Sequence, residues 1–374
     1  MTATKAYVLQ EKDAPFKLED VVLADVEANE VLIEVVASGI CHTDLCIQNG
    51  AFPSPFPNVT GHEGSGKVLK AGSAVTRVKE GDSVLLSFNY CSNCGPCKMD
   101  EPSGCENFAP CNFGRQRNEQ IGSKAGIRRA NGDEVYGAFF GQSSFAQHAV
   151  VVENSVVKVP TDTDLVTLAP LGCGLGTGAG ALLNFLKPAE SSSVSIFGLG
   201  AVGAGALFAA KYLGVETIIV VDLVDKKLEL AKELGATHVI SAKDPEIVSK
   251  IKNLTKYNMG ATYSVECSGN VKALLTAWES LANRGHLVSC GTPGPGTPIP
   301  FGIFENLLGS KTYTGLTEGG SNPPEFIPRL IQLHKEGHFP VEKISKTFKM
   351  EEFDDAVHAM HTGETIKPII VFGK

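Results

Sequence analysis

The feature that most constrains the fold is a regular alternation of strand-like and helix-like segments in the second half of the chain. The expected strands are Val194–Phe197, Thr217–Asp222, His238–Ser241, Thr262–Glu266, His286–Cys290 and Lys311–Gly315. The expected helices between them are Ala201–Leu213, Lys226–Leu234, Pro245–Thr255 and Val271–Leu281. Strands that alternate with helices of this length predict a parallel, doubly wound α/β sheet, and six strands make a complete dinucleotide-binding domain.

The first 160 residues predict a different, β-rich unit. Glu30–Ala37 and Ser83–Ser87 are apolar and β-branched, and Gly61–Val68 and Ala71–Val78 are broken by glycine and lysine at turn-like intervals. Beyond Leu316 the alternation stops, and helical segments lead to an apolar strand at Pro368–Phe372. A chain of 374 residues accommodates two domains. We expect the C-terminal tail to return to the first of them.

A glycine motif marks a candidate nucleotide site. Gly198, Gly200 and Gly203 form G-x-G-x-x-G between an expected strand and an expected helix, with Ala201 and Val202 inside the motif. The glycines permit a tight turn and close approach to a pyrophosphate, which the helix N-terminus attracts. Asp222 ends the next strand, where a carboxylate would accept hydrogen bonds from a ribose and repel a 2′-phosphate, so NAD is favoured over NADP. The alternative is a glycine-rich helix–sheet contact without a ligand.

Charge and the chain ends limit the cellular partners. With 33 basic and 41 acidic residues, the net charge of −8 argues against a general nucleic-acid binder. Met1–Tyr7 lacks the pattern of a signal peptide. The long uncharged runs Leu165–Leu186 and Ser191–Ala210 are too rich in glycine for membrane spans. We therefore expect a cytoplasmic protein without membrane contact, in which cysteines stay reduced and bind metal or take part in catalysis.

Four of the ten cysteines form one compact motif. They are Cys91, Cys94, Cys97 and Cys105, with Gly95, Pro96 and Gly104 allowing the loop to turn. Four thiolates without an open position predict a tetrahedral, structural zinc site. The alternative, four unligated thiols on a loop, would leave reactive groups exposed.

A second group of potential ligands is dispersed along the chain. It consists of Cys41-His42-Thr43-Asp44, Gly61-His62-Glu63-Gly64 and Gly172-Cys173-Gly174. Their spacing alone does not join them, because a lone cysteine is often a small core residue. From these residues by themselves, a second metal site and separate structural roles both stay open.

Taken together, these motifs resemble the zinc-dependent alcohol dehydrogenases of the medium-chain dehydrogenase/reductase family, in order and separation across essentially the whole chain. Gly141–Ala146 and Pro170–Gly174 are most similar to the aryl (benzyl) alcohol dehydrogenase branch. The resemblance implies a GroES-like catalytic domain over 1–172, completed by 316–374, and an NAD-binding Rossmann domain over 173–315. It also implies interconversion of an alcohol, primary and aromatic or allylic, with its aldehyde by hydride transfer to or from NAD. Two zinc ions per chain and a homodimer or homotetramer are implied as well.

The resemblance assigns roles around the metal. Cys41, His62 and Cys173 would bind the catalytic zinc, and Glu63 would coordinate it transiently during ligand exchange. Asp44 would hold the far nitrogen of His62. Thr43 would bind the substrate oxygen and pass its proton on.

Further roles concern the cofactor. The resemblance places His42 and Lys367 at the pyrophosphate, Thr177 beside the nicotinamide and Lys227 at the adenosine ribose. Cys46 departs from the family, because many relatives carry a proton-relaying histidine there and a thiol is a poorer relay near neutral pH. Cys46, Cys111, Cys267 and Cys290 receive no role.

The sequence leaves two other interpretations. One is a family member that acts mainly as a reductase of a specialised aldehyde or enal in a biosynthetic pathway. The other is a non-enzymatic nucleotide-sensing or zinc-scaffold protein, which the complete catalytic set argues against. Candidate substrate contacts are Phe88, Phe145 and Thr292–Thr297, and the basic segment Gly114–Arg129 is a candidate for steering an anionic substrate or a solvated loop.

Overall fold

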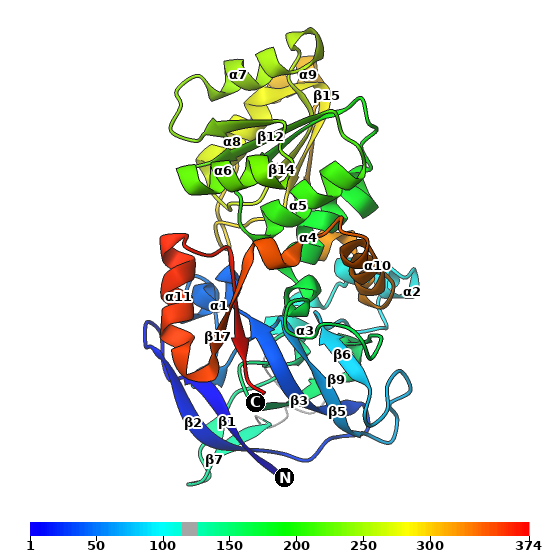
Figure 1. Ribbon diagram of the computed structural model, residues 1–374, viewed down its shortest axis with the longest axis vertical. Coiled ribbons are helices and arrows are strands. Elements are labelled where there is room, and N and C mark those ends of the chain that lie inside the picture. The colour runs from blue at the N-terminus through cyan, green and yellow to red at the C-terminus, as the bar shows by residue number, and fades with distance from the viewer. Residues whose placement is uncertain (114–125, 374) are drawn as a thin grey trace. The chain divides into compact units, whose positions relative to one another are not determined.

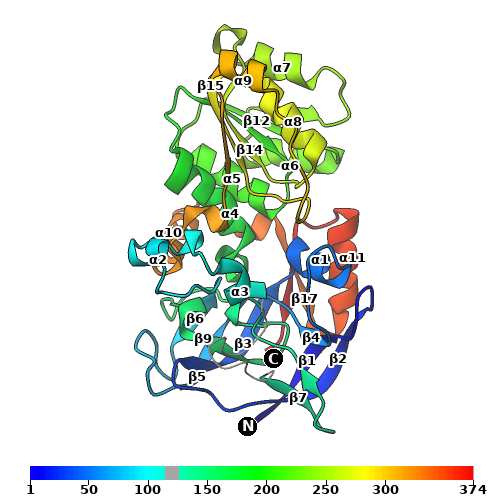
Figure 2. The same cartoon turned by 180° about the vertical axis from the view of Figure 1, so that it is seen from behind.

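The computed structural model describes residues 1–113 and 126–373, so most of the basic segment Gly114–Arg129 lies outside the described residues. Contacts divide the chain into two compact units. The catalytic unit comprises residues 1–173, 322–332 and 341–374, and the cofactor unit comprises residues 174–321 and 333–340. Figures 1 and 2 show the ribbon from opposite sides.

The cofactor unit, described over its whole length, contains one six-stranded sheet in the order β13-β12-β11-β14-β15-β16. Its strands are β11 (Ser193–Phe197), β12 (Thr217–Asp222), β13 (His238–Ser241), β14 (Ala261–Glu266), β15 (Leu281–Ser289) and β16 (Thr312–Gly315). All neighbouring strands are parallel. The order reverses between β11 and β14, which is the switch point where doubly wound sheets bind nucleotides. The predicted Rossmann sheet is confirmed.

Helices cover both faces of this sheet (Figures 1 and 2). They are α4 (Gly174–Gly180), α5 (Ala201–Tyr212), α6 (Asp225–Leu234), α7 (Ile247–Leu254), α8 (Val271–Ser280) and α9 (Ile303–Gly309). Small residues bring α5 close to α4, because a Cβ added at Gly205 would lie 2.2 Å from the Leu175 carbonyl oxygen. Leu274, Trp278 and Ile219 are among the residues of the core on the other side of the sheet from this helix pair.

The described part of the catalytic unit contains two sheets. One has the order β4-β1-β2-β7-β8, and the other has the order β10-β6-β5-β3-β18-β17 with β9 also paired to β3. The strands are β1 (Thr2–Leu9), β2 (Phe16–Leu23), β3 (Glu30–Gly39), β4 (Asn58–Val59), β5 (Gly64–Ala71), β6 (Ser83–Leu86), β7 (Ile127–Arg129), β8 (Glu134–Val135), β9 (His148–Val152), β10 (Val156–Lys158), β17 (Ser345–Lys349) and β18 (Lys367–Val371). The predicted β-rich domain is therefore present.

The C-terminal tail returns to the catalytic unit as expected. Strand β18 pairs antiparallel with β3, with Ile369 opposite Gly39. Its parallel neighbour β17 was not predicted, because its side chains are mostly exposed and it lacks an apolar run. The helices of this unit are α1 (His42–Gln48), α2 (Gly95–Lys98), α3 (Phe108–Phe113), α11 (Phe353–Thr362) and most of α10 (Pro323–Lys335).

Between residues 316 and 340, the boundaries of the two units differ from those of the predicted domains. The cofactor unit extends to residue 321 instead of 315 and also takes in 333–340. Asn184 Nδ2 donates to the Gly319 carbonyl oxygen at 3.3 Å, and the Phe339 ring packs on Phe208 with centroids 5.5 Å apart. The first contact joins Gly319 to the π-helix Ala181–Leu186 that follows α4, and the second joins Phe339 to α5.

Two predicted substrate contacts lie in cores instead. Phe145 is fully buried, and its ring packs against Phe16 and Phe353 with centroids 6.0 and 5.0 Å apart. Phe88 is equally buried and packs against Tyr90 and Phe108. Both side chains stabilise the catalytic unit, and neither is a candidate for substrate contact.

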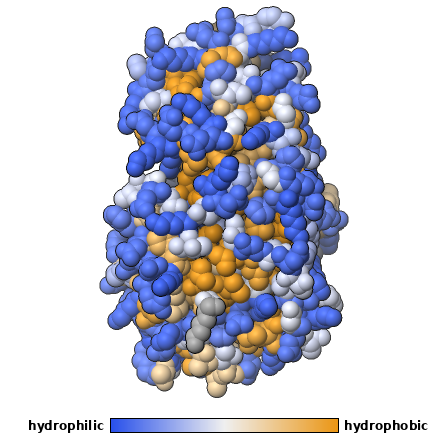
Figure 3. All heavy atoms as spheres, viewed as in Figure 1, coloured by the Kyte–Doolittle hydropathy of each residue, from blue (hydrophilic) through white to orange (hydrophobic). Residues whose placement is uncertain are grey.

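Hydrophilic and hydrophobic residues are interspersed on the face of the molecule drawn in Figure 3. Among the described residues, no helix combines the length and the apolarity needed to cross a membrane.

Candidate active site and metal centres

The dispersed ligand candidates meet in the catalytic unit. One ligand atom each from Cys41, His62, Glu63 and Cys173 lies within 4.8 Å of the others. Cys41 immediately precedes α1, His62 precedes β5, and Cys173 follows the 3-10 helix Ala169–Gly172. Tertiary folding thus joins three segments whose spacing in the sequence did not connect them.

Asp44 orients two of these segments. Its Oδ1 lies 3.1 Å from His62 Nδ1 and accepts a hydrogen bond from the Gly61 N–H at 2.9 Å. Its Oδ2 accepts from the Cys41 N–H at 3.1 Å. A carboxylate at Nδ1 selects the tautomer whose other nitrogen is free to bind a metal.

The remaining donor atoms fit a metal ion. His62 Nε2 is buried and has no hydrogen-bond partner among the described residues. A hydrogen bond with Cys173 lowers the pKa of the Cys41 thiol well below its usual value, although burial opposes this, and the thiolate is the form that binds metal. Two cysteines and one histidine suit zinc, with a fourth position left for an exchangeable ligand.

Glu63 forms a buried ion pair behind this cluster. Its Oε1 and Oε2 lie 2.9 and 2.8 Å from Lys367 Nζ, which also donates to the Ile40 carbonyl oxygen at 3.0 Å. Burial acts to lower the pKa of Lys367, but the Glu63 carboxylate outweighs it, so the pKa is raised. The three donors of the ammonium group are therefore engaged within the unit. The predicted pyrophosphate contact of Lys367 would require one of them to change partner, and it stays a prediction.

Aromatic rings pack on the buried histidine. The Phe140 ring stacks on the His62 imidazole with centroids 4.6 Å apart, and the Phe139 ring meets it edge-on at 5.3 Å. Phe113 contacts both phenylalanines. These rings shield the ligand from water and give the cluster an apolar border.

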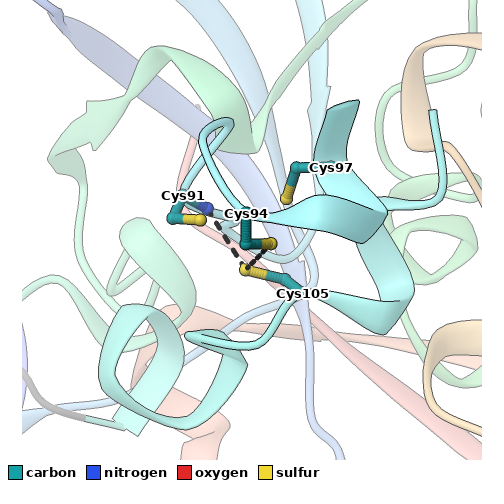
Figure 4. A group of neighbouring side chains, drawn as sticks. All are labelled: Cys91, Cys94, Cys97 and Cys105. Carbon is teal, nitrogen blue, oxygen red and sulfur yellow. Dashed lines mark hydrogen bonds between the residues drawn. The ribbon is translucent and has the colours of Figure 1, made fainter. Parts of the chain in front are cut away.

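The four-cysteine loop forms a second candidate metal centre (Figure 4). The ligand atoms of Cys91, Cys94, Cys97 and Cys105 lie within 4.8 Å of one another. Thiolates bound tetrahedrally at about 2.3 Å are about 3.8 Å apart, and the Sγ atoms of Cys94 and Cys105 lie 3.9 Å apart. Burial acts to raise the pKa of Cys91, but hydrogen bonds from Asn107 and from backbone N–H groups lower it to about 6, whereas burial raises the pKa of Cys97 and that of Cys105. The loop fits a structural zinc ion.

The nucleotide motif lies between β11 and α5. Gly198 has φ of +91°, and a Cβ added at Gly203 would lie 1.9 Å from the Gly198 carbonyl oxygen, so both positions require glycine. A Cβ at Gly200 would meet nothing within 4 Å. The first and third glycines therefore make the turn compact, and the second leaves open space for a phosphate next to Ala201 and Val202.

Asp222 supports this turn and keeps acceptor capacity. Its Oδ2 accepts from the Leu199 N–H at 2.7 Å, and its Oδ1 accepts from the Val224 N–H at 2.9 Å. A carboxylate has about four acceptor positions, so about two remain for ribose hydroxyls. Lys227 lies half-buried in the first turn of α6, near the end of β12.

Two further predicted cofactor residues lie on other elements. Thr177 is buried in α4, where its hydroxyl donates to Glu318 Oε2 at 3.4 Å. His42 is exposed as the first residue of α1 in the catalytic unit. Their contacts with a cofactor stay predictions.

Three of the four remaining cysteines have thiols with raised pKa values. Burial, with contributions from Cys41 and Asp44, raises the pKa of the Cys46 thiol, so it is a poor proton relay at neutral pH. Burial also raises the pKa of Cys290 to about 12 and that of Cys267 well above its usual value.

Fold and site together define the class: a two-domain, zinc-dependent dehydrogenase with a dinucleotide cofactor. The chain belongs to the zinc-dependent alcohol dehydrogenase family, and it matches the alcohol dehydrogenase GroES-like domain over residues 27–161 and the zinc-binding dehydrogenase over residues 201–336. Alcohol dehydrogenases are the standard example of a catalytic zinc held by two cysteines and one histidine. Two zinc ions per chain and NAD are typical of the family.

Individual relatives agree over the full length. Geraniol dehydrogenase of Castellaniella defragrans is 38% identical over 371 residues, which is 99% of this chain and 98% of the relative. The crystal structure of benzyl alcohol dehydrogenase from Acinetobacter calcoaceticus is 40% identical with a TM-score of 0.92, and that of an alcohol dehydrogenase zinc-binding domain protein from Burkholderia ambifaria is 39% identical with a TM-score of 0.95. Each of these two structural matches covers 100% of this chain and 100% of the solved chain.

Sequence reasoning missed several residues around the catalytic cluster. Phe140 stacks on His62, and the side chains of Gln142 and Ser87 bind the backbone of the ligand segments. Gln142 lies in a motif that resembles the aryl alcohol branch, but nothing in that motif indicates which backbone groups the amide contacts. The position of Lys367 beside Glu63 was likewise not foreseen.

Proposed function

We propose that this protein oxidises primary aromatic or allylic alcohols to aldehydes with NAD, and catalyses the reverse reduction. The observation that carries the proposal is the buried His62 Nε2, which has no hydrogen-bond partner among the described residues and lies beside the Cys41 and Cys173 thiols. The relatives that act on geraniol and on benzyl alcohol support the substrate class. Half-buried Phe113, held by the buried rings of Phe139 and Phe140, supports it further, because flat unsaturated groups pack well against aromatic rings.

Zinc, when bound, supplies the Lewis acidity that lowers the pKa of an alcohol hydroxyl, and NAD accepts the hydride. The chain itself manages the proton and the orientation. The Thr43 hydroxyl, 3.8 Å from Cys41 Sγ, lies at the edge of the cluster, where it accepts the proton of the alcohol while it passes its own hydroxyl proton on toward solvent. Asp44 holds the imidazole in place, while the phenylalanine rings keep water from it.

Cofactor reduction by the purified, zinc-loaded protein tests this proposal. Benzyl alcohol and geraniol should exceed ethanol in kcat/KM by about tenfold or more, since the apolar ring contacts are lost with ethanol. NAD should be preferred to NADP, because Asp222 repels a 2′-phosphate. Assays with the matching aldehydes and NADH would show whether reduction dominates, as a biosynthetic reductase requires. No turnover of any alcohol or aldehyde despite two bound zinc ions per chain would contradict the proposal, and a preference for NADP would contradict the role of Asp222.

We further propose that two copies associate through one edge of the cofactor sheet. Strand β16 is the last in the strand order, and the preceding α9 exposes Ile303, Phe304, Leu307 and Leu308, each by at least 65%. An edge strand beside exposed apolar side chains is suited to pair with its own copy about a two-fold axis. Light scattering should give the mass of a dimer or tetramer, and Phe304→Asp with Leu307→Asp should reduce it to half or to the monomer. Met259→Asp, which changes an exposed apolar residue elsewhere, is the control. A monomeric wild-type protein would contradict this interface.

Six of the ten cysteines converge on the two candidate metal centres, which suits a reducing compartment, so we place the protein in the cytoplasm. Recovery of the native protein in a secreted fraction would contradict this placement.

A further inference from the structure

A buried glutamine connects segments that carry the catalytic ligands. The Gln142 side chain is fully buried, and its amide group donates to the His62 carbonyl oxygen at 2.9 Å and to the Ser87 carbonyl oxygen at 3.1 Å. Its Oε1 accepts from the Gly64 N–H at 3.1 Å. One side chain therefore binds backbone groups of the residues before and after Glu63 and of the residue that follows β6.

Ser87 continues this connection to the third ligand segment. Its hydroxyl donates to the Gly172 carbonyl oxygen at 2.6 Å, directly before Cys173 in the sequence. The contact is close, since a Cβ added at Gly172 would lie 1.9 Å from the Leu86 carbonyl oxygen. We call Gln142 and Ser87, with these hydrogen bonds, the Gln142–Ser87 brace. Asp44 joins the Cys41 and His62 segments, and the brace joins the His62 segment to that of Cys173.

The turn that presents Gln142 has a costly backbone. Ala138, Phe140 and Ser143 have φ of 60°, 52° and 49°. These values lie in the left-handed region that residues other than glycine rarely adopt. The turn is held by the surrounding structure: the Ser155 hydroxyl donates to the Phe140 carbonyl oxygen at 2.9 Å, and the Ser143 hydroxyl donates to the Val59 carbonyl oxygen at 2.7 Å. Such backbone conformations persist where neighbouring contacts over-determine them, and they concentrate at functional sites.

We infer that Gln142 and Ser87 are positioning residues, which set the separation of His62 and Cys173 and thereby the metal affinity of the catalytic site. The inference rests on the proposed function only in that the Cys41–His62–Cys173 cluster binds the catalytic zinc. Groups that orient metal ligands commonly change metal affinity or activity when removed, although they never touch the ion. The competing explanation is that the brace contributes only to the overall stability of the catalytic unit.

Zinc release from the intact protein distinguishes the two explanations. In Gln142→Met, which keeps the length of the side chain but loses its hydrogen bonds, zinc affinity of the catalytic site should fall by about 10–100-fold. Zinc in the four-cysteine loop should be retained and serves as the internal reference. Ser87→Ala should change the affinity in the same direction, and the double variant should lose less than the two separate effects combined, because both residues act through one connection.

Cobalt substitution at the catalytic site provides a second measurement. The visible absorption bands of the bound cobalt should shift in both variants, because the ligand geometry changes. Two matched controls should behave as wild type. They are Gln147→Met, at the residue directly before β9, and Ser280→Ala, which loses a buried hydroxyl in α8.

Lower thermal stability with unchanged zinc affinity and an unchanged cobalt spectrum would overturn the inference. If Gln142→Met fails to fold, Ser87→Ala alone decides between the outcomes by the same measurements. Because metal affinity is measured without turnover, a wild-type protein that binds two zinc ions but oxidises no alcohol would contradict the proposed function and leave this inference standing.

Discussion

Cys173→Ala is expected to lose the catalytic metal and to lower kcat/KM for alcohol oxidation by about a thousandfold or more. A metal ion that stabilises developing charge contributes several kcal/mol to the transition state, and about 4 kcal/mol corresponds to a thousandfold in rate. Cys173 is 8% exposed and its replacement removes one sulfur atom, so the fold should remain nearly intact. The effect is therefore expected in metal content and turnover rather than in folding.

Metal analysis of two matched variants checks this assignment. Cys173→Ala should retain one zinc ion per chain, held by the four-cysteine loop. Cys97→Ala should lose that ion instead and should be measurably less stable to heat and to protease within 91–105, because binding of a structural metal contributes directly to the folding of its loop. If Cys97→Ala abolished turnover without loss of stability while Cys173→Ala unfolded, the two sites would have been assigned the wrong way round.

Lys367→Met should destabilise the catalytic unit by about 3–5 kcal/mol, the range observed when one partner of a buried ion pair is removed. Lys367 is 1% exposed and Glu63 is fully buried, so the carboxylate would lose the ammonium group that faces both of its oxygens, in a place where water does not replace it. The loss arises from the unpaired charge more than from the missing attraction. Removing the charge of Glu63 as well should therefore recover most of the stability.

Urea denaturation of three variants tests this argument. Lys367→Met should unfold at much lower urea concentration than wild type, and Glu63→Gln with Lys367→Met should lie close to wild type. Lys346→Met removes an exposed ion pair with Glu364 and should change little, because solvent already screens those charges. A double variant that is no more stable than Lys367→Met would show that packing of the lysine side chain, rather than charge pairing, stabilises the unit.

The cofactor domain was largely predictable because its signals are local and repeated. Thr217–Asp222 and His238–Ser241 were predicted with the bounds that the structure shows. Parallel strands covered on both faces consist of nearly continuous apolar runs, which stand out between amphipathic helices. Strand β17 has no such run, since it pairs along only one side and exposes most of its side chains, and no sequence pattern marks it.

The sequence by itself determined the features whose parts lie close together in the chain. These are the four-cysteine loop, the glycine turn before α5 and the acidic end of β12, where spacing alone restricts the geometry. Only the tertiary structure decided the catalytic cluster and its supports. Lys367 and Glu63 are 304 positions apart, and Gln142 and His62 are 80 apart. A buried charge or amide needs a hydrogen-bonding partner, and the fold determines which residue provides it. That pairing cannot be predicted from the order of residues along the chain.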